Sequence, residues 1–191
     1  SLTIGENAPD FSLKDQSGRV RQLSDYKGKK LVIYFFPKAF TPGWTKQACG
    51  LRDNYESFKT NNISILGVSY DSQAKLKDFK EEYDLSFNLL SDDNKVMGNL
   101  YDVNNFYFFP QRKTFLINEK GVLVHIINSV NINNHAEDIL KIFKNDEFRK
   151  FVNWRWQLAY NSVGLEAGYN VVKDRFVQPW IFRQIEKQKI H

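Results

Sequence analysis

The sequence predicts an α/β protein in which a central sheet of mixed strand directions is flanked by helices. Two apolar runs rich in β-branched and aromatic residues, 31–36 and 63–69, are typical of buried central strands. Segments with helical spacing of apolar residues alternate with these runs. Two further β-rich runs, 113–117 and 122–127, flank a short turn ending in Gly121 and indicate a hairpin. Alternating strands and helices that close on a hairpin require a mixed sheet.

The other elements follow from apolar spacing and capping residues. Ala48, Leu51 and Phe58 repeat at helical spacing, and Ser72 is a suitable N-cap. The expected elements are a helix over 46–61, a helix from Ser72 to 83, a short strand over 87–92, a short helix over 94–101 and a helix over 135–144. Together with the central strands, this order fits a thioredoxin-like fold.

Composition indicates a globular chain. Its 191 residues suit one domain with an extension, and 42% apolar residues can form a core. No run of about 18 apolar residues is present, so no transmembrane segment is expected. The net charge of +5 comes from scattered Lys and Arg residues, which favours a solvated surface over a nucleic-acid site.

The start of the chain leaves its compartment open. No signal-peptide pattern is present, and the chain begins at Ser1 rather than methionine. Removal of an initiator or cleavage of a targeting segment would each explain this. With the basic composition, we expect a mitochondrion or plastid, with the cytoplasm as the alternative.

Cysteine and histidine usage argues against a disulfide or a metal site. Cys49 is the single cysteine, so an intrachain disulfide and a cysteine-based metal site are excluded. The histidines at 125, 135 and 191 lack metal-ligand spacing. We therefore expect no metal and no cofactor.

Four stretches in order carry a family resemblance. They are "APDFSLKDQSGRVRQLSDYKGKKLVIYFFPKAFTPGWTKQACGLRD", "LGVSYDS", "LLSD" and "RKTFLINEKG". They resemble peroxiredoxins of the Q type, also called bacterioferritin comigratory protein. The resemblance covers residues 3–145, so we expect a peroxiredoxin-like thioredoxin-fold domain over 1–145 and an extension over 146–191.

The resemblance implies a site built around a thiolate that attacks a peroxide O–O bond and becomes a sulfenic acid. Within it, Pro37 corresponds to the residue that shields the sulfur and Thr41 to the hydroxyl that orients peroxide. Arg112 corresponds to the guanidinium that stabilises the thiolate, and Cys49 to the resolving cysteine. Trp44 stands at the position of the reactive cysteine.

Trp44 removes the nucleophile, because an indole offers only an N–H donor. The resemblance therefore implies a degenerate site, unless Trp44 is a sequence variant. We expect Trp44 to pack against the aromatic residues of 106–109 or another part of the chain, and Arg112 to form an ion pair or stack on an aromatic face. For Cys49, a structural role is favoured over a reactive or partner-linked thiol, because it lies more than a turn inside the expected helix.

The extension over 146–191 contains nine aromatic residues, and eight Lys or Arg residues against five Asp or Glu. A helix over 147–161 is expected from its apolar spacing. Aromatic residues are depleted in disordered tails, so these rings need a surface to bury them. One interpretation is that the segment wraps its own domain. The other is that it docks on a protein partner. Its expected contact residues are Phe148, Phe151, Trp154, Trp156, Tyr160 and Trp180.

Three functional hypotheses follow. The first is a catalytically inactive peroxiredoxin-like subunit of a larger, organellar protein complex, docked through the extension. The second is an active thiol peroxidase or redox sensor that uses Cys49. The third is a regulatory module that binds a ligand in the old peroxide pocket. Nucleic acid and a membrane surface are weaker alternatives as partners, because no recognised binding pattern supports either.

Overall fold

The computed structural model describes residues 2–104 and 108–163 of the chain. It divides into two compact units, Ser1–Leu140 and Lys141–His191. The helix α5 (His135–Val163) passes through the boundary between them without interruption. It also continues through residue 145, where the sequence interpretation places the end of the first domain.

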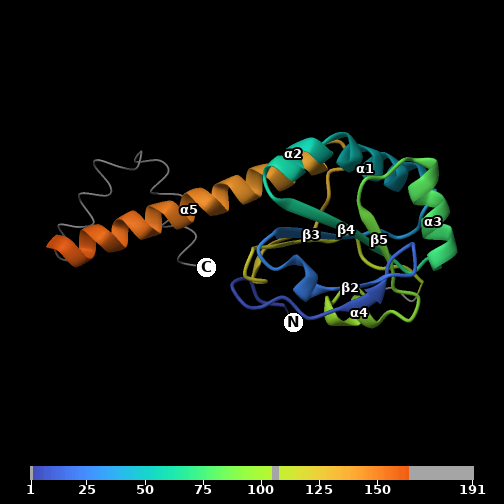
Figure 1. Cartoon of the computed structure of the whole chain (residues 1–191), viewed down its shortest axis with the longest axis horizontal. Helices are drawn as coiled ribbons and strands as arrows, with labels where there is room; N and C mark the ends of the chain where they lie inside the picture. Colours follow the sequence, from blue (N-terminus) through green and yellow to red (C-terminus); the bar gives the residue numbers. More distant parts are fainter. Residues whose placement is uncertain (1, 105–107, 164–191) are drawn as a thin grey trace. The chain divides into compact units, whose positions relative to one another are not determined.

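The first unit is built on a five-stranded sheet with the strand order β5-β4-β3-β6-β7 (Figure 1). β3 pairs parallel with β4 and antiparallel with β6, so the sheet is mixed as expected. This is the predicted thioredoxin-like arrangement. The strands are β3 (Lys30–Phe35), β4 (Ile63–Ser69), β5 (Asn88–Ser91), β6 (Thr114–Ile117) and β7 (Leu123–Ile127).

Three short elements near the N-terminus were not anticipated from the sequence. β1 (Ser12–Lys14) and β2 (Val20–Gln22) form a small antiparallel hairpin, and the 3-10 helix η1 (Leu23–Tyr26) follows. Each strand has only three residues with mostly exposed side chains, so no strong apolar alternation marks them. The buried Asp15 instead holds the turn, because it accepts hydrogen bonds from the Ser17 and Arg19 backbones and pairs with Arg21.

The helix expected over 46–61 is wrong in its bounds. α1 (Pro42–Asp53) begins four residues earlier, because Thr41 is extended and Pro42 suits the first helical turn. Asn54 then breaks the helix by donating a side-chain hydrogen bond back to the Gly50 carbonyl, and α2 (Tyr55–Thr60) follows. By contrast, Ser72 caps α3 (Gln73–Glu82) as predicted, since its hydroxyl accepts from the Lys75 amide. The short helix α4 (Val96–Leu100) also forms.

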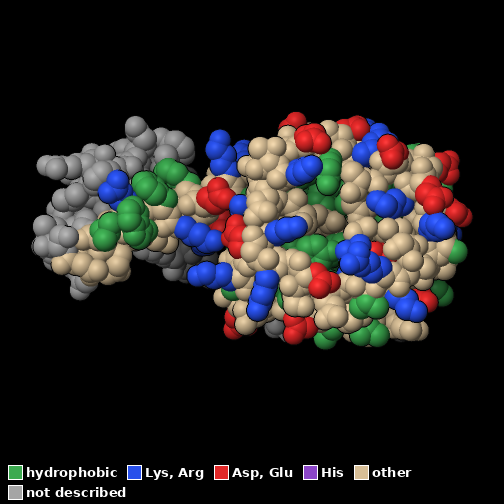
Figure 2. Space-filling view, in the orientation of Figure 1, with side chains coloured by type: hydrophobic (Ala, Val, Ile, Leu, Met, Phe, Trp, Pro, Cys, Tyr) green, Lys and Arg blue, Asp and Glu red, His purple; other side chains and the backbone are tan. Residues whose placement is uncertain are grey.

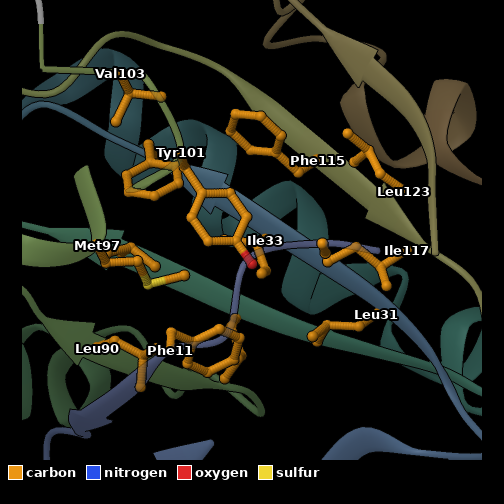
Figure 3. Packing of buried hydrophobic residues seen from close by; sticks show 14 residues of the cluster. Phe11, Leu31, Ile33, Leu90, Met97, Tyr101, Val103, Phe115, Ile117 and Leu123 are labelled. Atoms are coloured by element: carbon orange, nitrogen blue, oxygen red, sulfur yellow. The ribbon is translucent and has the colours of Figure 1, made fainter. Parts of the chain in front are cut away.

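Apolar side chains cover both faces of the sheet. On one face Leu31, Ile33 and Phe115 pack with Phe11 from the N-terminal segment and Tyr101 after α4 (Figure 3). On the other face lie α1, α2 and α3, and their buried side chains include Leu51, Phe58 and Phe79. Successive residues of β3 thus point to opposite sides and are all buried, as in a central strand of a two-sided sheet.

α5 joins two helices that the sequence analysis treats separately, over 135–144 and 147–161. The intervening Asn145–Asp146 pair favours a break by propensity. The Asp146 carboxylate instead forms ion pairs with two residues one turn further along the helix. Its oxygens are 2.8 Å from a guanidinium nitrogen of Arg149 and 3.3 Å from the ammonium nitrogen of Lys150. These local ion pairs support helix through the weak point.

Candidate functional site

The loop that leaves the C-terminal end of β3 sets the position of Trp44. Ala39 N donates to the Asp71 carboxylate at 2.8 Å, and the Thr41 hydroxyl donates to the Lys38 carbonyl at 3.0 Å. Thr41 is the N-cap residue of α1, although its side chain makes no capping bond. Trp44 therefore lies in the first turn of α1, where backbone amides have no partner inside the helix.

The indole of Trp44 is buried, with 7% of its surface exposed. The guanidinium carbon of Arg112 lies 4.7 Å from the centroid of this ring. That distance is within the range of an attractive cation–π contact. Arg112 itself is exposed, so its guanidinium covers the indole from the solvent side. The stacking expected of Arg112 is therefore present, with Trp44 as the aromatic face.

The expected aromatic cluster around Trp44 is only partly within the described residues. Residues 106 and 107 lie outside them, and Phe108 and Phe109 are 79% and 45% exposed. Phe40 has a positive φ of 65° and packs on Phe79 at the edge of α3, with ring centroids 5.2 Å apart. Within the described residues, Arg112 is the side chain that lies over the Trp44 ring, and packing of Trp44 against residues 106–109 stays a prediction.

Pro37 and Thr41 lie on the same loop as Trp44 and are both partly buried. The structure thus brings Pro37, Thr41, Trp44 and Arg112 to one end of the sheet. Cys49 lies elsewhere on α1. Five residues after Trp44, it is rotated by about 140° around the helix axis, so the two side chains point in different directions. Cys49 is partly buried and has no disulfide partner.

A buried polar network beneath α1 was missed by the sequence analysis. His135 is only 2% exposed. Its Nδ1 is 3.0 Å from the side-chain amide nitrogen of Gln47, and its Nε2 is 2.9 Å from the hydroxyl oxygen of Thr114. Burial lowers the pKa of His135 to about 4, so the ring is neutral at pH 7. The network joins α1, β6 and the start of α5. No sequence signal pairs residues so far apart along the chain.

Tyr34 lies against this network, with its ring centroid 6.1 Å from that of His135. It is 1% exposed, and its hydroxyl has no hydrogen-bond partner in the described part of the chain. A Cβ at Gly67 would lie 2.9 Å from the Tyr34 hydroxyl, so glycine at 67 makes room for the phenol. Burial raises the pKa of Tyr34 well above its usual range, which keeps the hydroxyl neutral.

In the second unit, α5 carries a stripe of exposed apolar residues, hereafter the α5 stripe: Phe148, Phe151, Trp154 and Leu158, between 40% and 55% exposed. Hydrophobic side chains can be seen along this helix in Figure 2. The Arg155 guanidinium lies over the Phe151 and Trp154 rings, at 5.6 and 5.2 Å. Of the other expected contact residues, Trp156 is partly buried, Tyr160 is helical, and Trp180 lies outside the described residues.

Nothing in the described part of the chain forms a cluster of potential metal ligands. No helix there is long and apolar enough to cross a bilayer. On the face shown in Figure 2, Lys and Arg side chains alternate with Asp and Glu, as expected for a solvated surface. The arrangement at Trp44 offers a buried indole and a stacked guanidinium.

Comparison with known proteins identifies the framework. The AhpC/TSA family model matches residues 4–126. Peroxiredoxin Bcp of Bacillus subtilis is 42% identical over 151 residues, which is 75% of this chain and 96% of the relative. The chloroplastic peroxiredoxin Q of Oryza sativa subsp. japonica is 40% identical over 146 residues, which is 75% of this chain and 67% of the relative.

Solved structures agree with these sequence relatives. Peroxidoxin BcpB of Mycobacterium tuberculosis superposes with a TM-score of 0.71 at 31% identity, covering 75% of this chain and 97% of that one. A cysteine-to-serine mutant of PrxQ from Xylella fastidiosa also gives 0.71, at 28% identity, covering 77% and 98%.

Proposed function

This chain belongs to the peroxiredoxin Q/Bcp family, and on that premise we propose that it is a catalytically inactive member serving as a subunit of a larger protein complex. The observation that carries the proposal is Trp44, buried in the first turn of α1 beneath Arg112. In the family pattern of Pro37, Thr41 and Arg112, the tryptophan stands where the attacking cysteine belongs. An indole has neither a nucleophile nor a proton that titrates near pH 7.

The geometry of the site supports loss of the reaction rather than its relocation. The space a thiolate and peroxide would share is filled by the indole, and the guanidinium that would stabilise a thiolate lies on the ring. Cys49 lies beyond the first turn of α1, where its own amide is inside the helix. It therefore does not occupy the position in the first turn of α1 that the family pattern gives to the attacking cysteine. A peroxidase or sensor working through Cys49 is the disfavoured alternative.

The α5 stripe supports the second half of the proposal. Its three aromatic residues and Leu158 present a continuous apolar face on consecutive turns of one helix. Aromatic anchors of this kind, flanked by arginine, are typical of interface hot spots. A helix bearing such a stripe can insert into an apolar groove on a partner protein. Organellar complexes are the proposed host, and the chloroplastic relatives are in keeping with a plastid.

Two measurements test the proposal. The first is the native size of the endogenous protein in gently solubilised source material, by native electrophoresis with mass spectrometry. Migration far above the 22.5 kDa of the chain, with constant co-migrating proteins, is expected. A free monomer or homodimer would refute the subunit role.

A pair of tagged variants assigns the contact. Phe151→Ser/Trp154→Ser should shift the chain from the complex to the free pool. Val96→Ser/Leu100→Ser is the matched control, because these α4 side chains are similarly exposed, at 54% and 47%. If both variants remain in the complex, the α5 stripe is not the docking surface.

The second measurement is peroxide consumption by the purified chain with a thiol reductant. The expected rate equals that of the Cys49→Ser variant and of reductant alone. Turnover by the wild-type chain that disappears in Cys49→Ser would establish the alternative, a peroxidase using Cys49, and would overturn the inactive assignment.

A further inference from the structure

A cavity of about 450 Å³ lies at the end of the sheet opposite Trp44. The N-terminal segment, η1, the loop before β3 and the β6–β7 turn surround it, and these segments lie side by side in Figure 1. Backbone hydrogen bonds tie them together, from Ala8 N to the Gly121 carbonyl at 2.9 Å and from Gly28 N to the Glu119 carbonyl at 2.9 Å. β3 is six residues long, so the cavity is roughly 20 Å from the Trp44 end.

The rim of the cavity is cationic. Lys27, Lys29 and Lys120 line it and are exposed, and Asp10 is the one carboxylate among the lining residues. Within the described residues, none of these three lysines forms an ion pair. Neighbouring Lys30 is different, because its ammonium pairs with Glu119 at 3.2 Å. Three ammonium groups against one carboxylate around the hollow concentrate positive potential there.

Asn118 adds an oriented hydrogen-bond donor. Its side-chain oxygen accepts from the backbone amides of Lys120 and Val122, both at 3.0 Å. These two bonds fix the carboxamide, and its NH₂ group has no acceptor within the described part of the chain. A fixed donor beside three lysines suits a ligand oxygen that carries negative charge.

Part of the cavity lining is apolar, hereafter the floor, and the cavity as a whole is larger than an inorganic ion alone would fill. Ala8, Leu23, Leu31 and Ile117 line it, together with the ring-bearing Tyr26. A volume of this size is typical of sites for small organic ligands. A small organic ligand whose anionic group contacted the lysines at the rim would place an uncharged, ring-containing part over the apolar side chains of the floor.

We propose that this cavity binds a small organic phosphate monoester, with the phosphate held by Lys27, Lys29, Lys120 and the Asn118 amide. A phosphate dianion matches the surplus of lysines over the single Asp10 better than a monoanionic carboxylate does. The site is independent of the chemistry lost at Trp44, because it lies at the other end of β3. It would add a ligand-binding function whether or not the chain is a complex subunit.

The test is a titration of the isotope-labelled full chain with adenosine monophosphate at low salt, followed by amide NMR. Saturable shifts are expected at Asn118, Lys120 and Gly121, with none at Trp44. Adenosine, which lacks the phosphate, should give no saturable shifts. Inorganic phosphate should bind more weakly than the nucleotide, because it leaves the apolar floor uncovered.

Charge-matched variants separate the site from general electrostatics. Lys29→Met/Lys120→Met should weaken nucleotide binding by about tenfold or more, since two charge-assisted contacts are lost. Lys77→Met/Lys144→Met removes the same charge from exposed lysines that do not line the cavity and should change the affinity by less than about threefold. Equal weakening by both pairs, equal binding of adenosine, or inorganic phosphate matching the nucleotide would each overturn the proposal.

Discussion

The contact between Trp44 and Arg112 can be measured as a coupling free energy. Trp44→Ala should lower the free energy of unfolding of the first unit by about 3–5 kcal/mol, the usual cost of truncating a buried aromatic residue. Arg112→Met should cost only about 0.5–1 kcal/mol. Its guanidinium is 4.7 Å from the ring but exposed, so water screens the attraction. In the Trp44→Ala background, Arg112→Met should cost almost nothing, because Arg112 then has no ring beneath it. The difference between the two Arg112→Met costs is the coupling free energy, about 0.5–1 kcal/mol.

Hydrogen exchange of the β3 amides is the suitable assay, since this fully buried strand opens only when its unit unfolds. Tryptophan fluorescence would be less suitable, because three of the four tryptophans lie beyond residue 145. Arg19→Met is a matched control for removing an exposed charge. A coupling below about 0.3 kcal/mol would show that the contact between Arg112 and the indole adds no stability. A Trp44→Ala cost below about 1 kcal/mol would show that the indole is not an integral part of the core.

Three further predictions concern the same end of the sheet. Trp44→Cys should raise thiol-dependent peroxide consumption at least about tenfold above the wild-type background, because Thr41 and Arg112 remain in place. Trp44→Ser is the control and should not raise it. Equal rates for Trp44→Cys and the wild-type chain would mean that more than the nucleophile has been lost. Burial lowers the pKa of His135 from 6.5 to about 4, so the folded chain binds fewer protons than the unfolded chain in that window. Stability should therefore fall by up to about 3 kcal/mol as pH drops from 6.5 to 4, and denaturant titrations of His135→Gln should show a flatter dependence. Tyr34→Phe should leave the free energy of unfolding unchanged or raise it by up to about 1 kcal/mol, because the buried hydroxyl it removes has no partner in the described residues; a loss above about 1 kcal/mol would indicate a hydrogen bond to it.

Local patterns were enough to predict most of the first unit. The apolar runs at 31–36 and 63–69 indicated the central strands because a strand buried on both faces needs no alternation. Ser72 marked a helix start because its hydroxyl caps one free amide. The break at Asn54 was missed, since a side-chain bond to the Gly50 carbonyl competes with the helix without any proline or glycine at the break itself.

The site was predictable only as far as its residues form a linear pattern. Pro37, Thr41 and Trp44 lie on one loop, and Arg112 could be added through the family resemblance. The Gln47–His135–Thr114 network could not be found, because its members come from three elements far apart in the chain. The lysine-lined cavity was missed for the same reason. Scattered lysines look like ordinary surface in the sequence, and only the fold brings Lys29 and Lys120 to one hollow.

The buried indole and the α5 stripe make opposite energetic contributions, which allows the two halves of the proposed function to fail separately. Trp44 buries apolar surface inside the first unit, so it stabilises that unit with or without a partner. The α5 stripe leaves apolar side chains in water, and burying them can stabilise only a state in which something covers the helix. The α5 stripe begins at Phe148, beyond residue 126, where the match to the family model ends. The Bacillus subtilis relative aligns with three quarters of this chain. An inactive chain that remains monomeric would therefore retain the first half of the proposal and lose the second.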